Sequence, residues 1–315
     1  MLQVSKRLSA YEPHIISVGT DDYPLTEHAD GIYHHRIKIS SIYRRIFNKL
    51  LGIDPYSYAK RASRIIERIH PDILHFHNVH NLIPDVLSYL SYKPVVISHL
   101  HNDFHITDSK GVDLILTCSE FLSSVYREKL QNNTVNIQSV YNGVDTETFN
   151  PSLKNSPLSL SLRSELRIPP DGKVILFAGR IAHEKGPHIL IEAFEKLISK
   201  MSDIYLVLVG EIRRTGRQND KRFLYGKDIL NRCKRLGGNV RIIGAVSPEK
   251  MPYFYSIGDI AVVPSVFEEP FGMVAIEAMA SGLPVIASKG GGMKEYIING
   301  ENGLFIDAEK THTNV

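Results

Sequence analysis

Short runs of β-branched and aliphatic residues alternate with longer amphipathic stretches from one end of the chain to the other. This alternation is typical of a parallel β-sheet with helices on its faces. In the first half the runs are Ile15–Val18, Ile32–Ile39, Ile73–His77, Val95–Leu100 and Leu114–Cys118. In the second half they are Val174–Ala178, Tyr205–Val209, Val240–Ile243, Ile260–Pro264, Val285–Ala287 and Leu304–Ile306. The pattern predicts an α/β fold with two Rossmann-like, doubly wound domains.

A segment rich in turn-forming residues separates the two halves. It runs from Tyr141 to Pro151 and is followed by a polar stretch from Ser152 to Ser156. Because 315 residues exceed the usual size of a single domain, two domains of about 150 residues each are expected. We place the boundary in this segment, with one domain at 1–148 and the other at 149–315.

Two elements of a complete doubly wound fold are missing from the pattern. Such a sheet opens with a strand, a glycine-rich turn and a helix, whereas this sequence opens with Met1–Leu8, which reads as helix. The absent strand would lie in the middle of the sheet, so unpaired backbone groups are expected on both of its neighbours. The sequence also stops at Val315 without the helices that would close the second domain.

Composition and charge exclude several classes of protein. With 43% hydrophobic and 23% charged residues the chain is an ordinary globular protein, not a disordered or fibrous one. The net charge of +3, with basic and acidic residues interleaved, does not require a nucleic-acid partner but suits a small anionic ligand. Cys118 and Cys233 lack metal-type spacing, which argues against a zinc site or a disulfide framework. Without a signal peptide or a membrane-length apolar run, a cytoplasmic location is expected.

The strongest chemical signal lies between Ser265 and Ser288, which read as a strand end, a glycine turn, a helix and a strand. A helix that begins near Gly272 would offer unpaired N–H groups and the positive end of its dipole, so a diphosphate could bind there without a metal. If the whole segment were helical, Glu269 and Glu277 would lie about 12 Å apart, which suits two sugars separated by a diphosphate.

A plainer interpretation makes these two glutamates solvated acids near a helix N-terminus. Glu277, however, lies among apolar residues, where an unpaired carboxylate would be costly to bury. This surrounding favours a role in holding a ligand rich in hydroxyl groups.

Two cations follow the predicted strand Val174–Ala178, at the edge where open α/β sheets bind ligands. Arg180 could bind phosphate through two hydrogen bonds and Lys185 could add a point charge, with Gly179 and Gly186 around them. Together they would stabilise the negative charge on a departing nucleoside diphosphate. The alternative is a surface charge cluster that includes Glu184.

Two weaker signals follow other predicted strands. Gly290–Gly292 would form a turn that a ligand can approach closely, before a helix at Met293–Ile298. The segment Gly244–Lys250, which contains Val246, would border a nucleobase.

Taken in this order, these residues resemble the C-terminal domain of glycosyltransferase family 4, the retaining nucleotide-sugar enzymes with the GT-B fold. The resemblance extends over nearly all of Val140 to Asp307. It implies a diphosphate clamp at Arg180 and Lys185, a residue beside the transferred sugar at Glu269 and a ribose ligand at Glu277. The resemblance also implies sugar and phosphate contacts around Phe271–Val274, that is, at Phe271, Gly272, Met273 and Val274.

Within this family the chain is similar to the bacterial spore coat protein SA group, through Lys185–Leu190 and through Ser119–Phe121 before Val140–Asp145. In the first half, Asp72–Asn78 and Ser98–Asp103 match places where family members set residues toward the cleft. The resemblance thus implies an acceptor-side role for His101 and, less directly, for His77 and Asn78. A structural role for His101 stays open as the alternative.

One more segment, Ile42–Leu51, is basic and amphipathic. It could lie on an anionic membrane, but a helix packed on the sheet with solvated cations is the simpler interpretation.

The resulting hypothesis is transfer of a hexosyl unit from a nucleoside-diphosphate sugar to a glycan or other hydroxyl acceptor, with retention of configuration. Acceptors in cell-surface, polysaccharide or spore-coat glycan synthesis fit this hypothesis, with peripheral association to the membrane or spore coat. The hypothesis needs no metal and no cofactor besides the donor, and the sequence has no Asp-x-Asp pair. The alternative is a non-catalytic coat or scaffold protein that keeps a donor-binding fold, and an epimerase or phosphorylase is a third reading.

Overall fold

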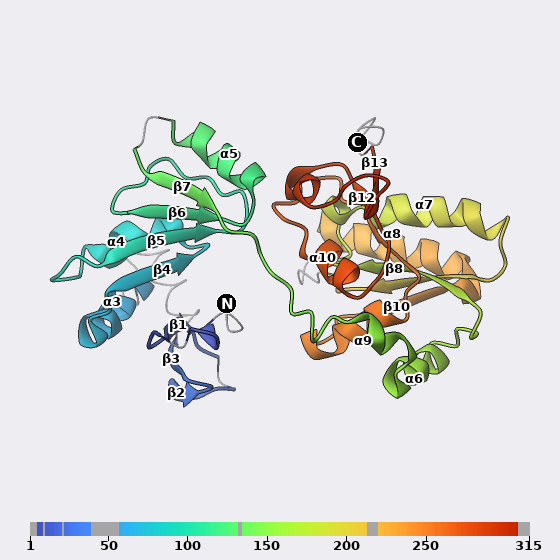
Figure 1. Ribbon diagram of the computed structural model, residues 1–315, viewed down its shortest axis with the longest axis horizontal. Helices are drawn as coiled ribbons and strands as arrows, with labels where there is room; N and C mark the ends of the chain where they lie inside the picture. The colour runs from blue at the N-terminus through green and yellow to red at the C-terminus, as the bar shows by residue number, and fades with distance from the viewer. Residues whose placement is uncertain are drawn as a thin grey trace. The chain divides into compact units, whose positions relative to one another are not determined.

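The structure is a computed structural model that describes residues 5–8, 10–20, 22–38, 57–131, 134–212 and 220–307 (Figure 1). The chain forms two compact units. Unit 1 contains residues 1–100, 104–116 and 126–138, and unit 2 contains residues 101–103, 117–125 and 139–315. The first half of the segment predicted as an N-terminal helix at Met1–Leu8, and the whole of the basic amphipathic stretch at Ile42–Leu51, lie outside the described residues.

Unit 1 contains two separate sheets with the strand orders β1-β3-β2 and β4-β5-β6-β7. The strands are β1 (His14–Val18), β2 (Thr26–Ala29), β3 (Ile32–Ile37), β4 (Ile73–His77), β5 (Val95–Leu100), β6 (Leu114–Thr117) and β7 (Asn136–Ser139). The helices are α3 (Tyr58–Ile69), η1 (His80–Leu82), α4 (Ile83–Leu87) and α5 (Glu120–Lys129), whose first residues group with unit 2. Among the described strands of unit 1, β1 and β4 each lie at an edge of their own sheet.

Local sequence explains the elements of unit 1. Helix α3 begins after Ser57, whose hydroxyl accepts a hydrogen bond from the Lys60 N–H, and ends at His70 in the left-handed conformation. The antiparallel pair β2–β3 turns through Asp30 and Gly31, both with positive φ, as a tight hairpin requires. Strand β2 was not predicted from the sequence.

Unit 2 contains one six-stranded parallel sheet in the order β10-β9-β8-β11-β12-β13. Its strands are β8 (Lys173–Ala178), β9 (Ile204–Val209), β10 (Val240–Gly244), β11 (Ile260–Val263), β12 (Val285–Ser288) and β13 (Gly303–Ile306). Its helices are η2 (Pro151–Asn155), α6 (Pro157–Glu165), η3 (His183–Lys185), α7 (Pro187–Ile198), α8 (Lys221–Arg235), η4 (Gly237–Asn239), η5 (Pro248–Lys250), α9 (Met251–Ser256), α10 (Met273–Ala280) and η6 (Gly291–Glu295). This is the doubly wound order 3-2-1-4-5-6, whose winding changes direction between β8 and β11.

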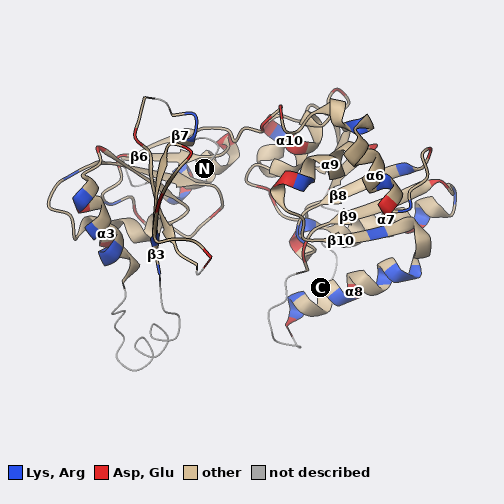
Figure 2. Ribbon diagram, turned by 90° about the horizontal axis from the view of Figure 1, so that it is seen from below, with Lys and Arg blue, Asp and Glu red and all other residues tan. Residues whose placement is uncertain are grey.

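Hydrophobic residues pack on both faces of this sheet. One core cluster joins the sheet to α9 and α10 through Phe254, Tyr255 and Ala278, and the other joins it to α7 and α8 through Phe194 and Ile229. Figure 2 shows lysine and arginine spaced along α8, whose apolar residues are turned to the sheet. Unit 2 is therefore a three-layer α/β domain.

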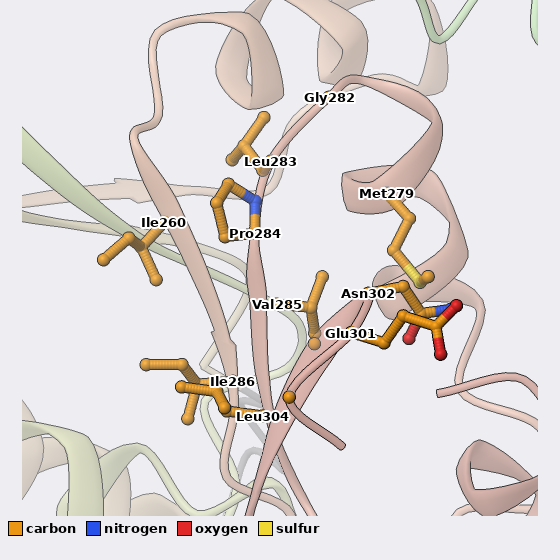
Figure 3. A pocket seen from close by; sticks show the side chains of 12 residues that line it. Ile260, Met279, Gly282, Leu283, Pro284, Val285, Ile286, Glu301, Asn302 and Leu304 are labelled. Carbon is orange, nitrogen blue, oxygen red and sulfur yellow. The ribbon is translucent and has the colours of Figure 1, made fainter. Parts of the chain in front are cut away.

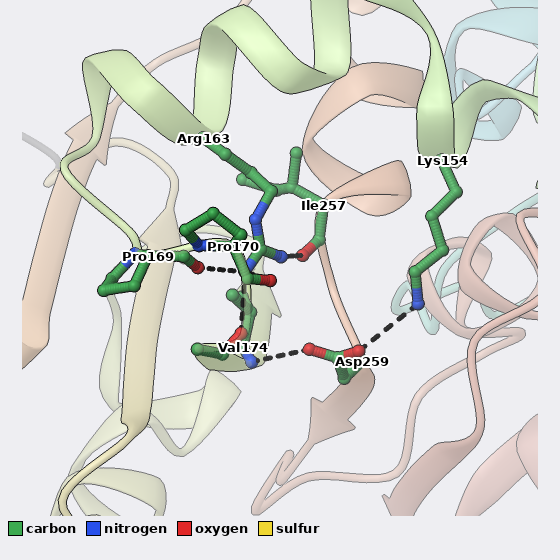
Figure 4. A network of polar contacts seen from close by, with 8 residues as sticks. Lys154, Arg163, Pro169, Pro170, Val174, Ile257 and Asp259 are labelled. Carbon is green, nitrogen blue, oxygen red and sulfur yellow. Dashed lines mark hydrogen bonds and ion pairs between the residues drawn. The ribbon is translucent and has the colours of Figure 1, made fainter.

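A network of polar contacts connects α6 and η2 to the segments where β8 and β11 begin (Figure 4). The guanidinium of Arg163 on α6 donates to the carbonyl oxygens of Ile257, Pro169, Pro170 and Gly172 at 2.7–3.3 Å. Asp259 accepts from the Val174 N–H at 2.9 Å and pairs with Lys154 at 3.2 Å. These bonds connect α6 and η2 to the starts of β8 and β11.

Among the described residues, no helix has the length and apolar character needed to cross a bilayer.

Candidate functional site

The change of winding direction places the ends of β8 and β11 side by side, because these two parallel strands pair directly. Gly179 and Arg180 follow β8, and Ser265 comes shortly after β11. Ligands of open α/β sheets bind in the crevice outside the carboxyl ends of the strands at such a point. The topology thus brings together the two segments in which the sequence predicted chemistry.

Lys185 and Glu269, 84 positions apart in the sequence, form an ion pair at this edge. The Lys185 Nζ lies 2.6 Å from the Glu269 Oε1, and both side chains are largely buried. The hydroxyl of Ser265 donates to the same carboxylate oxygen at 2.6 Å. The ammonium also lies 4.8 Å from the centre of the Phe267 ring, a favourable cation–π distance. Lys185 and Glu269 were predicted as site residues from the sequence. Their mutual contact and the contributions of Ser265 and Phe267 were not.

Glycine packing makes this pair possible. A Cβ on Gly186 would lie 1.8 Å from the Pro264 carbonyl oxygen, and one on Gly291 would lie 2.0 Å from the Glu269 carbonyl oxygen. The Gly292 N–H donates to that same Glu269 oxygen at 2.8 Å. Gly291 and Gly292 therefore support the backbone of Glu269, and the ligand-approach role that the sequence suggested for this turn stays a prediction.

The helix predicted after these glycines differs in the structure. A 3-10 helix covers Gly291–Glu295, in place of a helix at Met293–Ile298. The side chain of its last residue, Glu295, accepts hydrogen bonds from the N–H groups of Glu120 and Phe121 at the start of α5. These contacts with a distant segment could not be read from the sequence.

Helix α10 begins at Met273, and Gly272 is its N-cap with φ of +87°. A Cβ at Gly272 would lie 2.6 Å from the Met293 side chain, so both the conformation and the space favour glycine. Tyr296 donates to the carbonyl oxygens of Phe271 and Gly272 at 2.8 and 2.9 Å and so fixes this turn. Burial raises the pKa of Tyr296, which keeps its hydroxyl available as a donor.

This geometry leaves the first turn of α10, at Met273 and Val274, as the place where helix N–H groups lack intrahelical partners. No side chain of the N-cap residue occupies them. The predicted helix start near Gly272 is confirmed, and Phe271 beside it is buried.

Glu277 lies on α10 and accepts a hydrogen bond from the Tyr255 hydroxyl at 2.8 Å. Burial raises the pKa of the Glu277 carboxyl, and this hydrogen bond opposes the rise. Glu269 is only 5% exposed. The interpretation of these glutamates as merely solvated acids is therefore wrong. The 12 Å estimate of their separation does not apply either, because the chain is helical only from Met273 onward.

Arg180 forms its ion pair with Glu184 at 3.2 Å, and both side chains are about half exposed. This is the arrangement of the charge-cluster alternative, so the phosphate-binding role of Arg180 stays a prediction. Gly179 has φ of +146° after β8, and its N–H donates to the Val209 carbonyl oxygen at 2.9 Å. Val246 packs partly buried against the core cluster that contains α10.

His101 belongs to unit 2, whereas His77 and Asn78 belong to unit 1. Burial lowers the pKa of His101, so its imidazole is mainly neutral near pH 7. Its backbone carbonyl oxygen accepts from the Cys118 thiol at 3.7 Å. The acceptor-side role of His101 stays a prediction.

A separate hollow of about 510 Å³ lies at the amino ends of β11 and β12, lined largely by apolar residues beside α10 (Figure 3). Ile260, Pro284 and Leu304 are among its lining residues. Because it opens at the strand starts, it is distinct from the crevice that holds Lys185 and Glu269.

Comparison with known proteins matches both halves of the chain. Residues 160–314 match the family described as glycosyl transferases group 1, and residues 2–148 match Glycosyltransferase Family 4. The chain is 35% identical to the lipopolysaccharide 1,2-N-acetylglucosaminetransferase of Salmonella typhimurium, over 96% of this chain and 78% of that protein. The chain belongs to glycosyltransferase family 4. This family 4 glycosyltransferase is also 29% identical to spore coat protein SA of Bacillus subtilis, over 81% of this chain and 69% of the relative.

Solved structures agree on the fold of this glycosyltransferase. A glycosyltransferase from Rickettsia africae superimposes with a TM-score of 0.76 at 22% identity, covering 97% of this chain and 79% of that one. HepE of Anabaena, in a complex with UDP and glucose, gives a TM-score of 0.65 at 21% identity, with 88% and 72% covered. The fold is GT-B, as the sequence resemblance implied.

Proposed function

We propose that this family 4 glycosyltransferase transfers a hexosyl unit from a nucleoside-diphosphate sugar to a hydroxyl group of a cell-surface glycan, with retention of configuration. The observation that carries the proposal is the buried ion pair between Lys185 and Glu269, at the strand ends where the winding of the unit 2 sheet reverses. A buried lysine and glutamate are costly unless they serve each other or a ligand. Residues 149–315 form the proposed donor-binding domain.

In this proposal the donor diphosphate binds at the first turn of α10, near Gly272, Met273 and Val274. The helix dipole and the N–H groups stabilise its charge, and Lys185 and Arg180 add positive charge from the loop after β8. These groups provide the stabilisation that a metal ion provides in other transferases, so the transfer step is expected to proceed without one.

Glu269 and Glu277 would hold the two sugars of the donor. Glu269 is fixed by Lys185 and Ser265, so its second carboxylate oxygen remains oriented for the transferred sugar. Glu277 would accept from the hydroxyl groups of the ribose, which would relieve part of the cost of burying its carboxylate. Around this frame, Phe271 and Gly179 shape the site, Val246 borders the nucleobase, and His101 serves the acceptor.

The names of similar proteins suggest the substrates to test first. The Salmonella typhimurium relative is named for transfer of N-acetylglucosamine to lipopolysaccharide, and HepE of Anabaena was solved with UDP and glucose. We propose UDP as the nucleotide and a cell-surface oligosaccharide as the acceptor class.

The test is a transfer assay of the full chain with UDP-glucose, UDP-N-acetylglucosamine and their GDP counterparts, on lipopolysaccharide-derived oligosaccharides. Product NMR is expected to show the anomeric configuration of the donor, and EDTA is expected to leave the rate unchanged. Glu269→Gln and Lys185→Ala are expected to lower kcat/KM by at least about a hundredfold, as loss of transition-state stabilisation by one charged group does. Lys196→Ala, which removes a solvent-exposed Lys–Glu pair on α7, is the matched control and is expected to retain full activity.

Two results would contradict the proposal. Donor binding without hydrolysis or transfer, unaffected by Glu269→Gln, would favour the non-catalytic scaffold instead. Inverted product would refute retention while leaving transfer itself intact. His101→Ala separates acceptor from donor roles, because it is expected to reduce transfer more than donor hydrolysis.

A further inference from the structure

Three histidines of unit 1 converge on one face of the sheet formed by β4 and β5. His75 and His77 lie on β4 and His99 lies on β5, and their ring nitrogens can be chosen so that all lie within 4.8 Å of one another. The His75 Nε2 is 3.2 Å from the His99 Nδ1. The ring centres of His77 lie 4.3 Å from His75 and 5.1 Å from His99.

Strand register explains this cluster. Side chains two positions apart on a strand point to the same face, so His75 and His77 share one face of β4. Strand β5 pairs with β4 in parallel, with His99 directly opposite His77. The Asn78 N–H donates to the His99 carbonyl oxygen at 2.9 Å, which extends this pairing beyond the end of β4. The three rings are therefore carried by paired strands, a more rigid support than a loop.

The distances suit a transition-metal ion. A tetrahedral zinc ion with Zn–N bonds of about 2.0–2.1 Å places two nitrogen ligands about 3.3–3.4 Å apart. The observed 3.2 Å between the nitrogens of His75 and His99 is close to that value. The other nitrogen separations in the cluster are at most 4.8 Å, so a bound ion would draw the rings closer, and the side chain of His77 is only partly buried. Imidazole ligands suit zinc, copper and nickel, whereas magnesium and calcium prefer oxygen.

We propose that His75, His77 and His99 form a three-histidine site for a divalent transition metal, with zinc as the preferred physiological ion. Three protein ligands leave a fourth position for water or an added ligand. The three histidines belong to unit 1, and none of them is among the residues of the proposed donor site. This cluster was not predicted from the sequence, although the His-x-His pattern within Ile73–His77 is visible there.

The test measures zinc binding directly, independent of transferase activity. The full chain is stripped with a chelator, dialysed against zinc chloride and analysed by mass spectrometry for metal content and by calorimetry for affinity. His75→Ala is the first variant, because His75 is exposed and its loss should leave the fold intact. His77→Ala is the second, and His105→Ala, which removes another exposed unit 1 histidine, is the matched control. Circular dichroism verifies that each variant is folded.

The expected result is one zinc ion that the two cluster variants bind at least about tenfold more weakly, because even partners of metal ligands typically contribute that much. His105→Ala should bind as the wild type does. X-ray absorption of the zinc-loaded chain should give three imidazole nitrogens at about 2.0 Å. The proposal is overturned if the wild type binds no stoichiometric zinc, if His75→Ala and His77→Ala bind it equally well, or if the absorption spectrum requires a different ligand set.

Discussion

Replacing Lys185 with methionine tests how much the buried ion pair contributes to the folded state. Lys185 and Glu269 are 17% and 6% exposed, with 2.6 Å between the ammonium and the carboxylate. Removing one partner of a buried pair typically costs about 3–5 kcal/mol, because the other charge stays buried without its counterion. Ser265 still donates to the Glu269 carboxylate after the change. We therefore expect the lower end of this range, about 3 kcal/mol.

The same substitution at Lys196 provides the control. Lys196 forms an i,i+4 ion pair with Glu192 on α7 with 3.0 Å between charges, but these side chains are 74% and 62% exposed. Exposed pairs of this kind contribute about 0.3–0.5 kcal/mol. The double variant Lys185→Met with Glu269→Gln should recover about 2 kcal/mol of the loss, because the amide can keep the Ser265 hydrogen bond without a buried charge.

The assay is urea denaturation followed by far-UV circular dichroism, since the chain has no tryptophan for fluorescence. A loss at Lys185→Met within 1 kcal/mol of the loss at Lys196→Met would refute the reasoning. So would a double variant less stable than either single variant, because that result would mean that the two charges do not compensate each other.

Three further substitutions probe the frame of the site. Gly272→Ala should lower the free energy of unfolding by about 2–4 kcal/mol in a urea titration, because φ is positive there and the new Cβ would lie 2.6 Å from the Met293 side chain. Gly300→Ala is the control: φ is also positive there but no atom lies near, so it should cost about 1–2 kcal/mol. Because burial raises the pKa of Glu277, the folded chain binds that proton more tightly than the unfolded chain, and this contribution to stability is lost as pH rises above the ordinary carboxyl value. Glu277→Gln should therefore raise the melting temperature, relative to the wild type, more at pH 8 than at pH 4. The same substitution should weaken donor affinity in calorimetry. Equal changes in melting temperature at both pH values would contradict this reasoning. Arg163→Lys keeps the charge but not the four carbonyl contacts, so the urea titration should show a loss of about 2–3 kcal/mol, and a neutral outcome would show that those contacts are dispensable.

The strands of unit 2 were predictable because a parallel sheet covered on both faces requires continuous apolar runs. Each predicted run of the second half became a strand, with ends that differ by one residue at most. In unit 1, β2 and β7 were missed because Thr26–Ala29 and Asn136–Ser139 are short and polar, with alternating exposure. Asp30-Gly31 was the signal that could have located β2, since this dipeptide favours a hairpin turn.

Some residues of the candidate site were predictable from their motifs, whereas the residues that hold them in place were not. Lys185, Glu269 and Gly272 stand in motifs whose residue types match anion and sugar binding, so the sequence could nominate them. Tyr255, which donates to Glu277, and Tyr296, which donates to the turn at Gly272, could not be nominated. A tyrosine that fixes a glutamate or a turn is indistinguishable in the sequence from any core tyrosine.

The histidine cluster shows which part of a site cannot be predicted from the sequence. That His75 and His77 lie on the same face can be predicted from the sequence, because side chains two positions apart on a strand share a face. His99 joins them only through the register of β4 against β5, which places it opposite His77. A shift of that register by one residue would turn His99 to the other face of the sheet relative to its partners and separate the rings. Strand register depends on packing across the whole sheet, so a site assembled from two strands becomes visible only once the fold is known.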